Sequence, residues 1–374
     1  MRYPHSNYPS MIRLTIHRHL RFLTPFIAVF ALNLPNKGIA QQTATENPTA
    51  LSIRTLDKAI DEMVAKLSLE QKVGQMTQID LGVIAVGSPC GLQQPQTLDK
   101  VKLREAIEKY HIGSVLNVGC GSGTIALDRW HDIHRGIAQA EAEFSSTNIP
   151  ILFGIDAIHG VNYTVGGTMF PQQIGQAATW NPDLIVRAAE ITALECRLSG
   201  IPWNFSPVLD LGRQPLWSRF FETYGEDVYL AKSMAKASIR GYQGTSEGNT
   251  IDGKHVAACM KHFLGYSYPL SGKDRTPAWI PERELREYYL PTFQTAIAEG
   301  ALTVMINSGE LNGTPVCSHS FGRINQKERL TALLDLRAGP NKLTFHYTQA
   351  LITPQDPRQL AVIFLGLRLL APIA

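Results

Sequence analysis

The chain has 374 residues, of which 44% are hydrophobic and 18% are charged, and this composition is typical of a globular protein with one large domain or two small ones. Its formal net charge of +3 comes from residues 1–40, which hold five of the 35 basic residues and none of the 32 acidic ones. The rest of the chain is slightly acidic and lacks the basic face that nucleic-acid binding needs, so we expect no nucleic-acid partner.

Residues 1–40 are predicted to be a signal peptide. Basic residues precede an apolar run at 22–34, and Gly38-Ile39-Ala40 supplies a cleavage site of small residues. The apolar run is short and contains Pro25, which disfavours a spanning helix. We therefore expect a periplasmic or secreted protein with a linker at 41–50 and no membrane span once the leader is removed.

From residue 51 onward, short β-rich runs alternate with longer helical patterns. Ser68 followed by Gln71 is the capping-box pattern S-x-x-Q, which predicts the start of the first helix. Strands are predicted near 77–86 and at 113–118, 149–154, 203–209, 256–260 and 302–306, with helices at 125–144, 182–198, 228–242 and 282–299. Strands separated by single helices predict parallel βαβ units.

Six strands are two short of a closed (β/α)8 barrel, which takes about 250 residues. The alternation stops near Ser320, after which 321–359 is polar and irregular and 360–374 is almost wholly apolar, though too short to span a bilayer. We expect an α/β fold of the TIM-barrel type over 51–320, incomplete at its C-terminal end. We expect a divergent tail at 321–374 to follow this domain, and a frameshift would make that tail non-native sequence.

The cysteines and histidines indicate no metal site. None of the five cysteines forms a C-x-x-C pair; Cys90 and Cys120 are candidates for a disulfide, whereas Cys259 has the setting of a buried free thiol. His131 and His134 lie three apart on a predicted helix without an acidic motif partner, so they are expected on a surface or packed face. We predict neither a metal nor a cofactor.

Polar side chains follow three consecutive predicted strands. Asp156 follows one strand, the loop that holds Arg219 follows the next, and Lys261-His262 ends the third. In βα barrels the working residues lie at the carboxyl ends of strands. A sugar offers hydroxyl groups and an apolar face, which suit a carboxylate, fixed cationic donors and an aromatic ring such as that of Trp217. These clusters predict a sugar site.

Each of these residues, taken alone, also has a purely structural interpretation. Asp156 could cap a helix, and Arg219 could pair with Glu222 or Asp227 within its own loop. Only the repetition of charged clusters at neighbouring strand ends favours a site over these separate explanations.

Four runs in order resemble the N-terminal domain of glycoside hydrolase family 3, in particular its β-glucosidases. They are GIDAIHG (154–160), NFSPVLDLGRQPLWSRFFETYGED (204–227), AACMKHFLGYS (257–267) and VMINSGELNG (304–313). The resemblance implies a hydrolase that removes terminal β-D-glucosyl residues from glucosides or oligosaccharides, with retention and without a cofactor.

The resemblance also assigns the residues of the innermost sugar subsite. Asp156 would take the hydroxyls on the far side of the glucose ring, and Arg219, Lys261 and His262 would bind the neighbouring ones. Two weaker candidates, for which a solvated loop position is the alternative, are Arg275 and Ser308.

The catalytic carboxyl groups of the family have no counterpart in this sequence. Retaining glycosidases use two carboxyl groups about 5–5.5 Å apart. In the family the nucleophile stands in an S-D-W or T-D-W motif, and the acid/base Glu comes from a following domain. No Asp-Trp follows Val316 here, and Asp335 and Asp356 stand in unrelated contexts. A chain truncated or frameshifted before the nucleophile motif is the simplest interpretation, and a non-catalytic glucan-binding or sugar-binding protein competes with it.

The β-N-acetylhexosaminidase branch of the family is a further alternative, because its members have a single domain. That branch carries a D-S-H or D-T-H motif a few residues beyond K-H-F. Here 266–275 contain no histidine, and the next one is His319, which disfavours this activity.

Overall fold

The computed structural model describes residues 59–315 except 89–90, 93–95, 120–122 and 245–250. The predicted leader, the linker, the tail and the Cys90–Cys120 pair lie outside the described residues.

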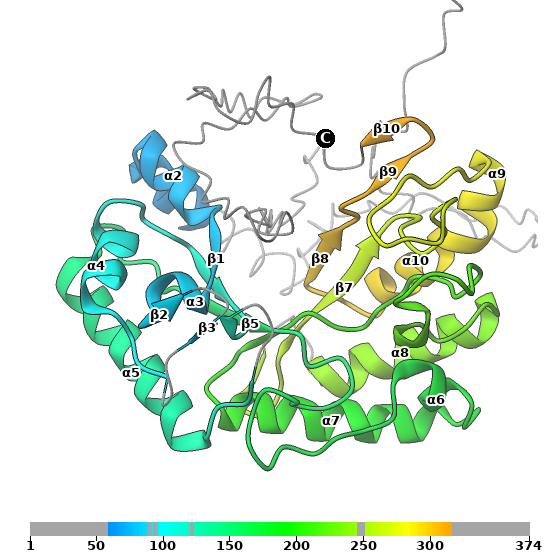
Figure 1. The fold of residues 1–374 in the computed structure, drawn as a ribbon, viewed down its shortest axis with the longest axis horizontal. Helices are drawn as coiled ribbons and strands as arrows, with labels where there is room; N and C mark the ends of the chain where they lie inside the picture. Colours follow the sequence, from blue (N-terminus) through cyan, green and yellow to red (C-terminus); the bar gives the residue numbers. More distant parts are fainter. Residues whose placement is uncertain (1–58, 89–90, 93–95, 120–122, 245–250, 316–374) are drawn as a thin grey trace, which may run out of the picture.

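Six strands form one parallel sheet, and each strand pairs with the strand that follows it in the order β1-β4-β5-β6-β7-β8 (Figure 1). The strands are β1 (Gln78–Asp80), β4 (Ser114–Leu116), β5 (Leu152–Ile155), β6 (Trp203–Asn204), β7 (Ala257–Phe263) and β8 (Thr303–Ile306). Sequential parallel pairing with helical crossovers is the topology of a TIM-type barrel. The predicted TIM-type fold is confirmed, and the described residues contain six strands of such a barrel.

Helices follow the outer side of this curved sheet, as Figure 1 shows for α5, α7 and α8. The longer ones are α4 (Lys100–Glu108), α5 (Leu127–Phe144), α7 (Pro182–Leu198), α8 (Val228–Gln243) and α10 (Leu290–Ala298). The short helical elements are α2 (Leu69–Gln75), α3 (Leu81–Ile84), α6 (Gln173–Ala177), η2 (Phe220–Glu222), α9 (Glu282–Glu284) and the π-helix η3 (Leu285–Tyr289). Two small hairpins join β2 (Gly87–Ser88) to β3 (Gly91–Leu92) and β9 (Glu310–Leu311) to β10 (Thr314–Pro315).

Local sequence signals set where the helices begin. The predicted capping box of α2 is confirmed, because the Ser68 hydroxyl accepts the Gln71 amide at 3.2 Å while the Gln71 side chain accepts the Ser68 amide at 2.9 Å. The Asn181 side chain caps α7 by accepting the Asp183 amide at 3.1 Å, with proline at the first helical position. As predicted, α7 covers residues 182–198.

Three predicted elements differ most from the structure, being much shorter or broken into pieces. The early strand ends at Asp80, because this side chain accepts the Gly82 amide at 2.7 Å and starts α3. The strand predicted at 203–209 ends at Asn204; Pro207, which has no N–H to donate, follows shortly after. The helix predicted at 282–299 is divided into α9, η3 and α10, with Pro291 at the start of α10 interrupting the regular ladder.

The two faces of the strands contact different cores. Along β7, Ala258 and Met260 pack in the large core between the sheet and the helices. Cys259 instead packs against Trp203 and Phe205 on the inner side of the curved six-stranded sheet, which is called the half-barrel below. Successive strand residues point to opposite faces, so Lys261 shares the inner face with Cys259. Cys259 is a buried free thiol, as predicted. Among the helices of the described part of the chain, none is both long and apolar enough to cross a bilayer.

Candidate functional site

An ion pair joins β7 to the end of β5 on the inner side of the half-barrel. The Lys261 Nζ donates to Asp156 Oδ1, and the Lys261 side chain is only 2% exposed. Asn117, which directly follows β4, donates its Nδ2 to Asp156 Oδ2 at 2.7 Å and accepts the Asp156 amide at 2.9 Å. Burial opposes the ionisation of Asp156, but the Lys261 charge and these hydrogen bonds hold its pKa below the ordinary value. The Asp156 carboxylate is therefore ionised and fixed, with 30% of its side chain exposed.

His262 is held by a carboxylate that the sequence analysis did not select. Its Nδ1 lies 2.7 Å from Asp210 Oδ2, which also accepts the His262 amide at 3.0 Å. Burial, followed by the charges of Arg219 and Lys261, lowers the pKa of His262 well below its ordinary value, so the imidazole is neutral. Burial also raises the pKa of Asp210 to about 7, against the hydrogen bond from the His262 amide. With Nδ1 directed at Asp210, Nε2 is the ring nitrogen that this contact leaves available to a ligand.

Arg219 immediately precedes η2 and forms a bidentate pair within its own loop. Its Nε and Nη2 donate to the two Glu222 carboxylate oxygens at 2.8 and 2.7 Å, so the structural alternative considered for Arg219 is real. The guanidinium also lies beside the rings of Trp217 and Tyr266, 6.0 and 5.6 Å from their centroids. Trp217 is 2% exposed, so it packs against Arg219 and does not present the open aromatic face that was predicted.

The structure thus brings together the four main predicted residues and leaves two at the margin. Lys261 contacts Asp156 directly, and His262 follows Lys261 in the chain. The charges of Lys261 and Arg219 act on both Asp156 and His262, so Arg219 also lies near these two side chains. Arg275 is exposed, with its Nε 3.7 Å from Asp274 Oδ2, and Ser308 is exposed just after β8. The sugar-binding roles assigned to all six residues remain predictions.

Sequence reasoning missed four residues that hold this cluster in place. Asp210 directly follows the strand predicted at 203–209 but was not selected. Asn117 lies inside the strand predicted at 113–118 and follows a strand only in the structure, where β4 ends at Leu116. Tyr266 and Asp274 lie in the loop between β7 and α9, and their contacts run to residues some fifty positions earlier. Local patterns carry no signal for such pairings.

The chemistry of the cluster suits a polyhydroxylated ligand. It offers a partly exposed carboxylate as acceptor, two cationic donors and a neutral imidazole, and each charge already has a partner of opposite sign. In the part of the chain that the structure describes, no three His, Cys, Asp or Glu side chains gather where they could hold a metal. Charge-assisted hydrogen bonds to hydroxyl groups are what this arrangement can supply.

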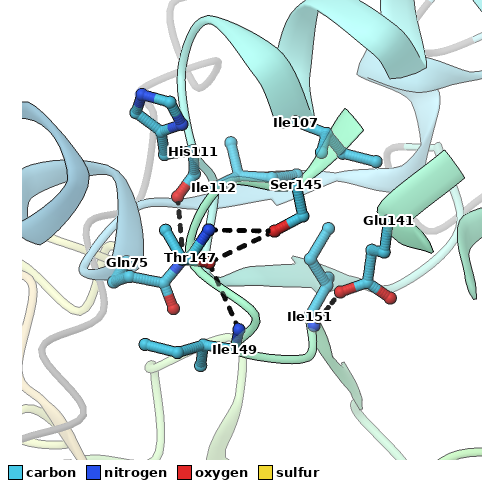
Figure 2. A pocket seen from close by; sticks show the side chains of 9 residues that line it. All are labelled: Gln75, Ile107, His111, Ile112, Glu141, Ser145, Thr147, Ile149 and Ile151. Atoms are coloured by element: carbon cyan, nitrogen blue, oxygen red, sulfur yellow. Dashed lines mark hydrogen bonds between the residues drawn. The ribbon is translucent and has the colours of Figure 1, made fainter. Parts of the chain in front are cut away.

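A small pocket lies at the opposite, amino-terminal end of the strands. Figure 2 shows its lining, which comes from the segments that lead into β1, β4 and β5: Gln75, Ile107, His111, Ile112, Glu141, Ser145, Thr147, Ile149 and Ile151. Hydrogen bonds join several of its segments: Glu141 accepts the Ile151 amide at 2.5 Å and Gln75 donates to the His111 carbonyl at 3.0 Å. This end of a barrel serves stability, so the pocket is not part of the candidate site.

Comparison with known families decides the relationship. Residues 68–323 match the glycosyl hydrolase family 3 N-terminal domain. The chain belongs to this family. The resemblance carried by the four sequence runs is confirmed, and the match covers the described sheet together with the cluster at its carboxyl ends.

Family 3 relatives are similar over most of this chain. A lysosomal beta glucosidase of Dictyostelium discoideum is 42% identical over 285 residues, and a periplasmic beta-glucosidase of Salmonella typhimurium is 28% identical over 265. These alignments cover 74% and 71% of this chain but 34% and 31% of the relatives. The chain thus spans about a third of the length of the curated relatives it matches.

Solved structures of the family give the same picture. An exo-1,3/1,4-beta-glucanase from a Pseudoalteromonas species superposes with a TM-score of 0.61 at 30% identity, covering 76% of this chain and 33% of the glucanase. A beta-glucosidase from Listeria innocua in complex with isofagomine gives a TM-score of 0.56 at 30% identity, covering 69% and 33%. The half-barrel is therefore the part of the family fold that these structures share with this chain.

The buried ion pair predicts a pH-dependent stability difference between the parent and Lys261→Met. Because the pKa of Asp156 is depressed in the folded state, the pair stabilises the fold above the ordinary aspartate value of about 3.9 and loses this effect as the pH falls further. We expect the variant to be less stable by about 3 kcal/mol at pH 7 and pH 5, and the difference to shrink by pH 3.

Urea unfolding at the three pH values measures this difference. Asp156→Asn removes the titrating group and is the control. Its free energy of unfolding should depend less on pH than that of the parent. A difference that stays the same from pH 7 to pH 3 would show that the ion pair is not its source.

Proposed function

We propose that this chain recognises the terminal β-D-glucosyl residue of glucosides or oligosaccharides, as part of β-glucosidase-type hydrolysis by family 3. The observation that carries the proposal is the Asp156–Lys261 pair with Arg219 and His262 beside it, at the carboxyl ends of the barrel strands. The names of the relatives support a glucosyl substrate, since they include beta-glucosidases, an exo-beta-glucanase and a Listeria innocua beta-glucosidase solved with glucose.

Each group of the cluster has a defined part in holding a sugar ring. The Asp156 carboxylate accepts hydrogen bonds from hydroxyl groups, and Lys261 and Arg219 donate to hydroxyl oxygens. The neutral His262 accepts through Nε2. Because the protein partners Asn117, Asp210 and Glu222 fix these side chains in advance, little side-chain entropy is lost on binding.

The same contacts favour binding over bond cleavage as the role of the three carboxylates of this cluster. In retaining hydrolysis one carboxylate attacks the anomeric carbon while a carboxylic acid protonates the leaving oxygen. Asp156 is neutralised by Lys261, Glu222 by Arg219, and Asp210 is directed at His262. A sugar-binding protein without turnover is therefore the second candidate function for this chain.

Glucose and cellobiose binding should depend on the buried ion pair. Lys261→Ala and Asp156→Asn each remove a hydrogen bond to a charged group, so we expect a loss of affinity of about ten- to a hundredfold by titration calorimetry. Lys254→Ala is the matched control, because this exposed lysine precedes the other end of β7. Equal dissociation constants for the parent and both site variants would place sugar binding elsewhere.

The 374-residue chain should bind β-glucosides without hydrolysing them. Its sequence after Val316 contains no S-D-W or T-D-W motif, and general acid–base help alone contributes about 10²- to 10⁴-fold in rate. We expect nitrophenol release from nitrophenyl β-glucoside at the background rate. Replacing the tail from Phe321 by a family-like helix, nucleophile strand and second domain should restore turnover. Hydrolysis by the unmodified chain that Asp335→Asn or Asp356→Asn abolishes would identify a nucleophile in the tail.

We infer that the protein is exported to the periplasm or the medium. The support is the basic, apolar and small-residue pattern of residues 1–40. Expression of the full chain in a bacterial host should give a processed protein outside the cytoplasm whose N-terminus is Gln41 by mass spectrometry. An unprocessed cytoplasmic product, with a known exported protein processed in the same cells, would contradict export.

A further inference from the structure

One carboxylate oxygen in the loop between β7 and α9 holds two aromatic side chains from different parts of the chain. Asp274 Oδ1 accepts the indole Nε1–H of Trp217 at 2.9 Å and the hydroxyl of Tyr266 at 2.7 Å. Trp217 lies in the loop before η2, and Tyr266 follows β7. Hydrogen bonds to an ionised acceptor are stronger than those between neutral groups. Asp274 therefore connects two segments that the sheet alone does not join.

Both aromatic rings in turn contact the residues assigned to sugar binding. The centroids of the Tyr266 and His262 rings are 4.6 Å apart. The Trp217 ring packs against the Tyr266 ring nearly at a right angle, with centroids 5.4 Å apart. The Arg219 guanidinium lies beside both rings, and its Nη1 is 3.5 Å from the Tyr266 oxygen. The positions of Arg219 and His262 thus depend on where these two rings are held.

The loop that carries Asp274 is braced on both sides. Its two arms pair where the Leu270 amide donates to the Pro277 carbonyl at 3.0 Å, and the Ala278 amide donates to the Glu310 carbonyl at 2.8 Å. Gln214, from the same loop as Trp217, donates to the Pro269 carbonyl at 3.2 Å. The backbone therefore presents Asp274 from a defined position.

We propose that Asp274 is a positioning residue for the sugar site, acting on Arg219 and His262 through Trp217 and Tyr266. The inference rests on the proposed sugar-binding function. Without the carboxylate, the indole N–H and the phenol lose the anchor that they share. The tilt of Tyr266 against His262 and the packing around Arg219 then become less defined, which weakens sugar binding without removing any group that touches the sugar.

Two substitutions at this position separate positioning from charge. Asp274→Asn keeps an Oδ1 acceptor for both donors, whereas Asp274→Ala removes it. Glucose titration calorimetry should show affinity about tenfold weaker for Asp274→Ala and within about threefold of the parent for Asp274→Asn. Lys273→Ala changes an exposed neighbour on the same loop and is the control for loop disturbance.

A second measurement follows the geometry without a sugar. In ¹⁵N-labelled protein, the indole resonance of Trp217, assigned with Trp217→Phe, and the imidazole resonances of His262 should both shift in Asp274→Ala and stay in place in Lys273→Ala. Tyr266→Phe, which removes one of the two donors but keeps the ring, should give an intermediate loss of affinity. It also serves if Asp274→Ala does not fold.

The outcomes distinguish this inference from the proposed function. Unchanged affinity and unshifted resonances in Asp274→Ala would overturn the positioning role while leaving sugar binding intact. If the parent itself binds no sugar, the proposed function fails. The resonances then decide alone whether Asp274 positions Trp217 and His262: shifts in Asp274→Ala support it, and unshifted signals overturn it.

Discussion

The ammonium group of Lys261 lies inside the half-barrel, and much of the site follows from the need to neutralise it there. A side chain that is 2% exposed can remain charged only if a partner of opposite sign and further hydrogen bonds replace its water. Asp156 supplies the charge, and Asn117 completes the carboxylate's hydrogen bonds. One residue from β7 and the residues directly after β4 and β5 are thereby held in one arrangement at the carboxyl ends of the strands.

Compensation of charge is repeated across the cluster. Arg219 is paired with Glu222, and His262 stays neutral against Asp210 because burial and the nearby cations both oppose its protonation. Such a site suits neutral, hydroxyl-rich ligands better than ions, which is consistent with membership of a glycosyl hydrolase family. Attack on an anomeric carbon requires a carboxylate that faces that carbon. Under the proposed function, recognition of the glucosyl ring and cleavage of its bond therefore fall to different groups.

The sequence by itself determined the fold class, the order of the strands and the main charged residues at their ends. The parallel βαβ pattern places Asp156, Arg219 and the Lys261-His262 pair at one end of the sheet, because the signal of each element is local in the chain. The end of β1 at Asp80 was not predicted. It depends on a single side chain, which caps α3 by accepting the Gly82 amide, and a cap of this kind changes the pattern of only a few residues.

Only the tertiary structure decided which groups meet. Asp210 and His262 are 52 residues apart in the chain, and Trp217 and Asp274 are 57 apart. No periodic pattern in the sequence predicts either contact. The burial of Trp217, which the sequence suggested as an open platform, follows from its contacts with neighbouring loops. Local patterns specify which face of an element a side chain occupies. Contacts between loops depend on how the strand ends are brought together, and that is set by the packing of the whole sheet against its helices.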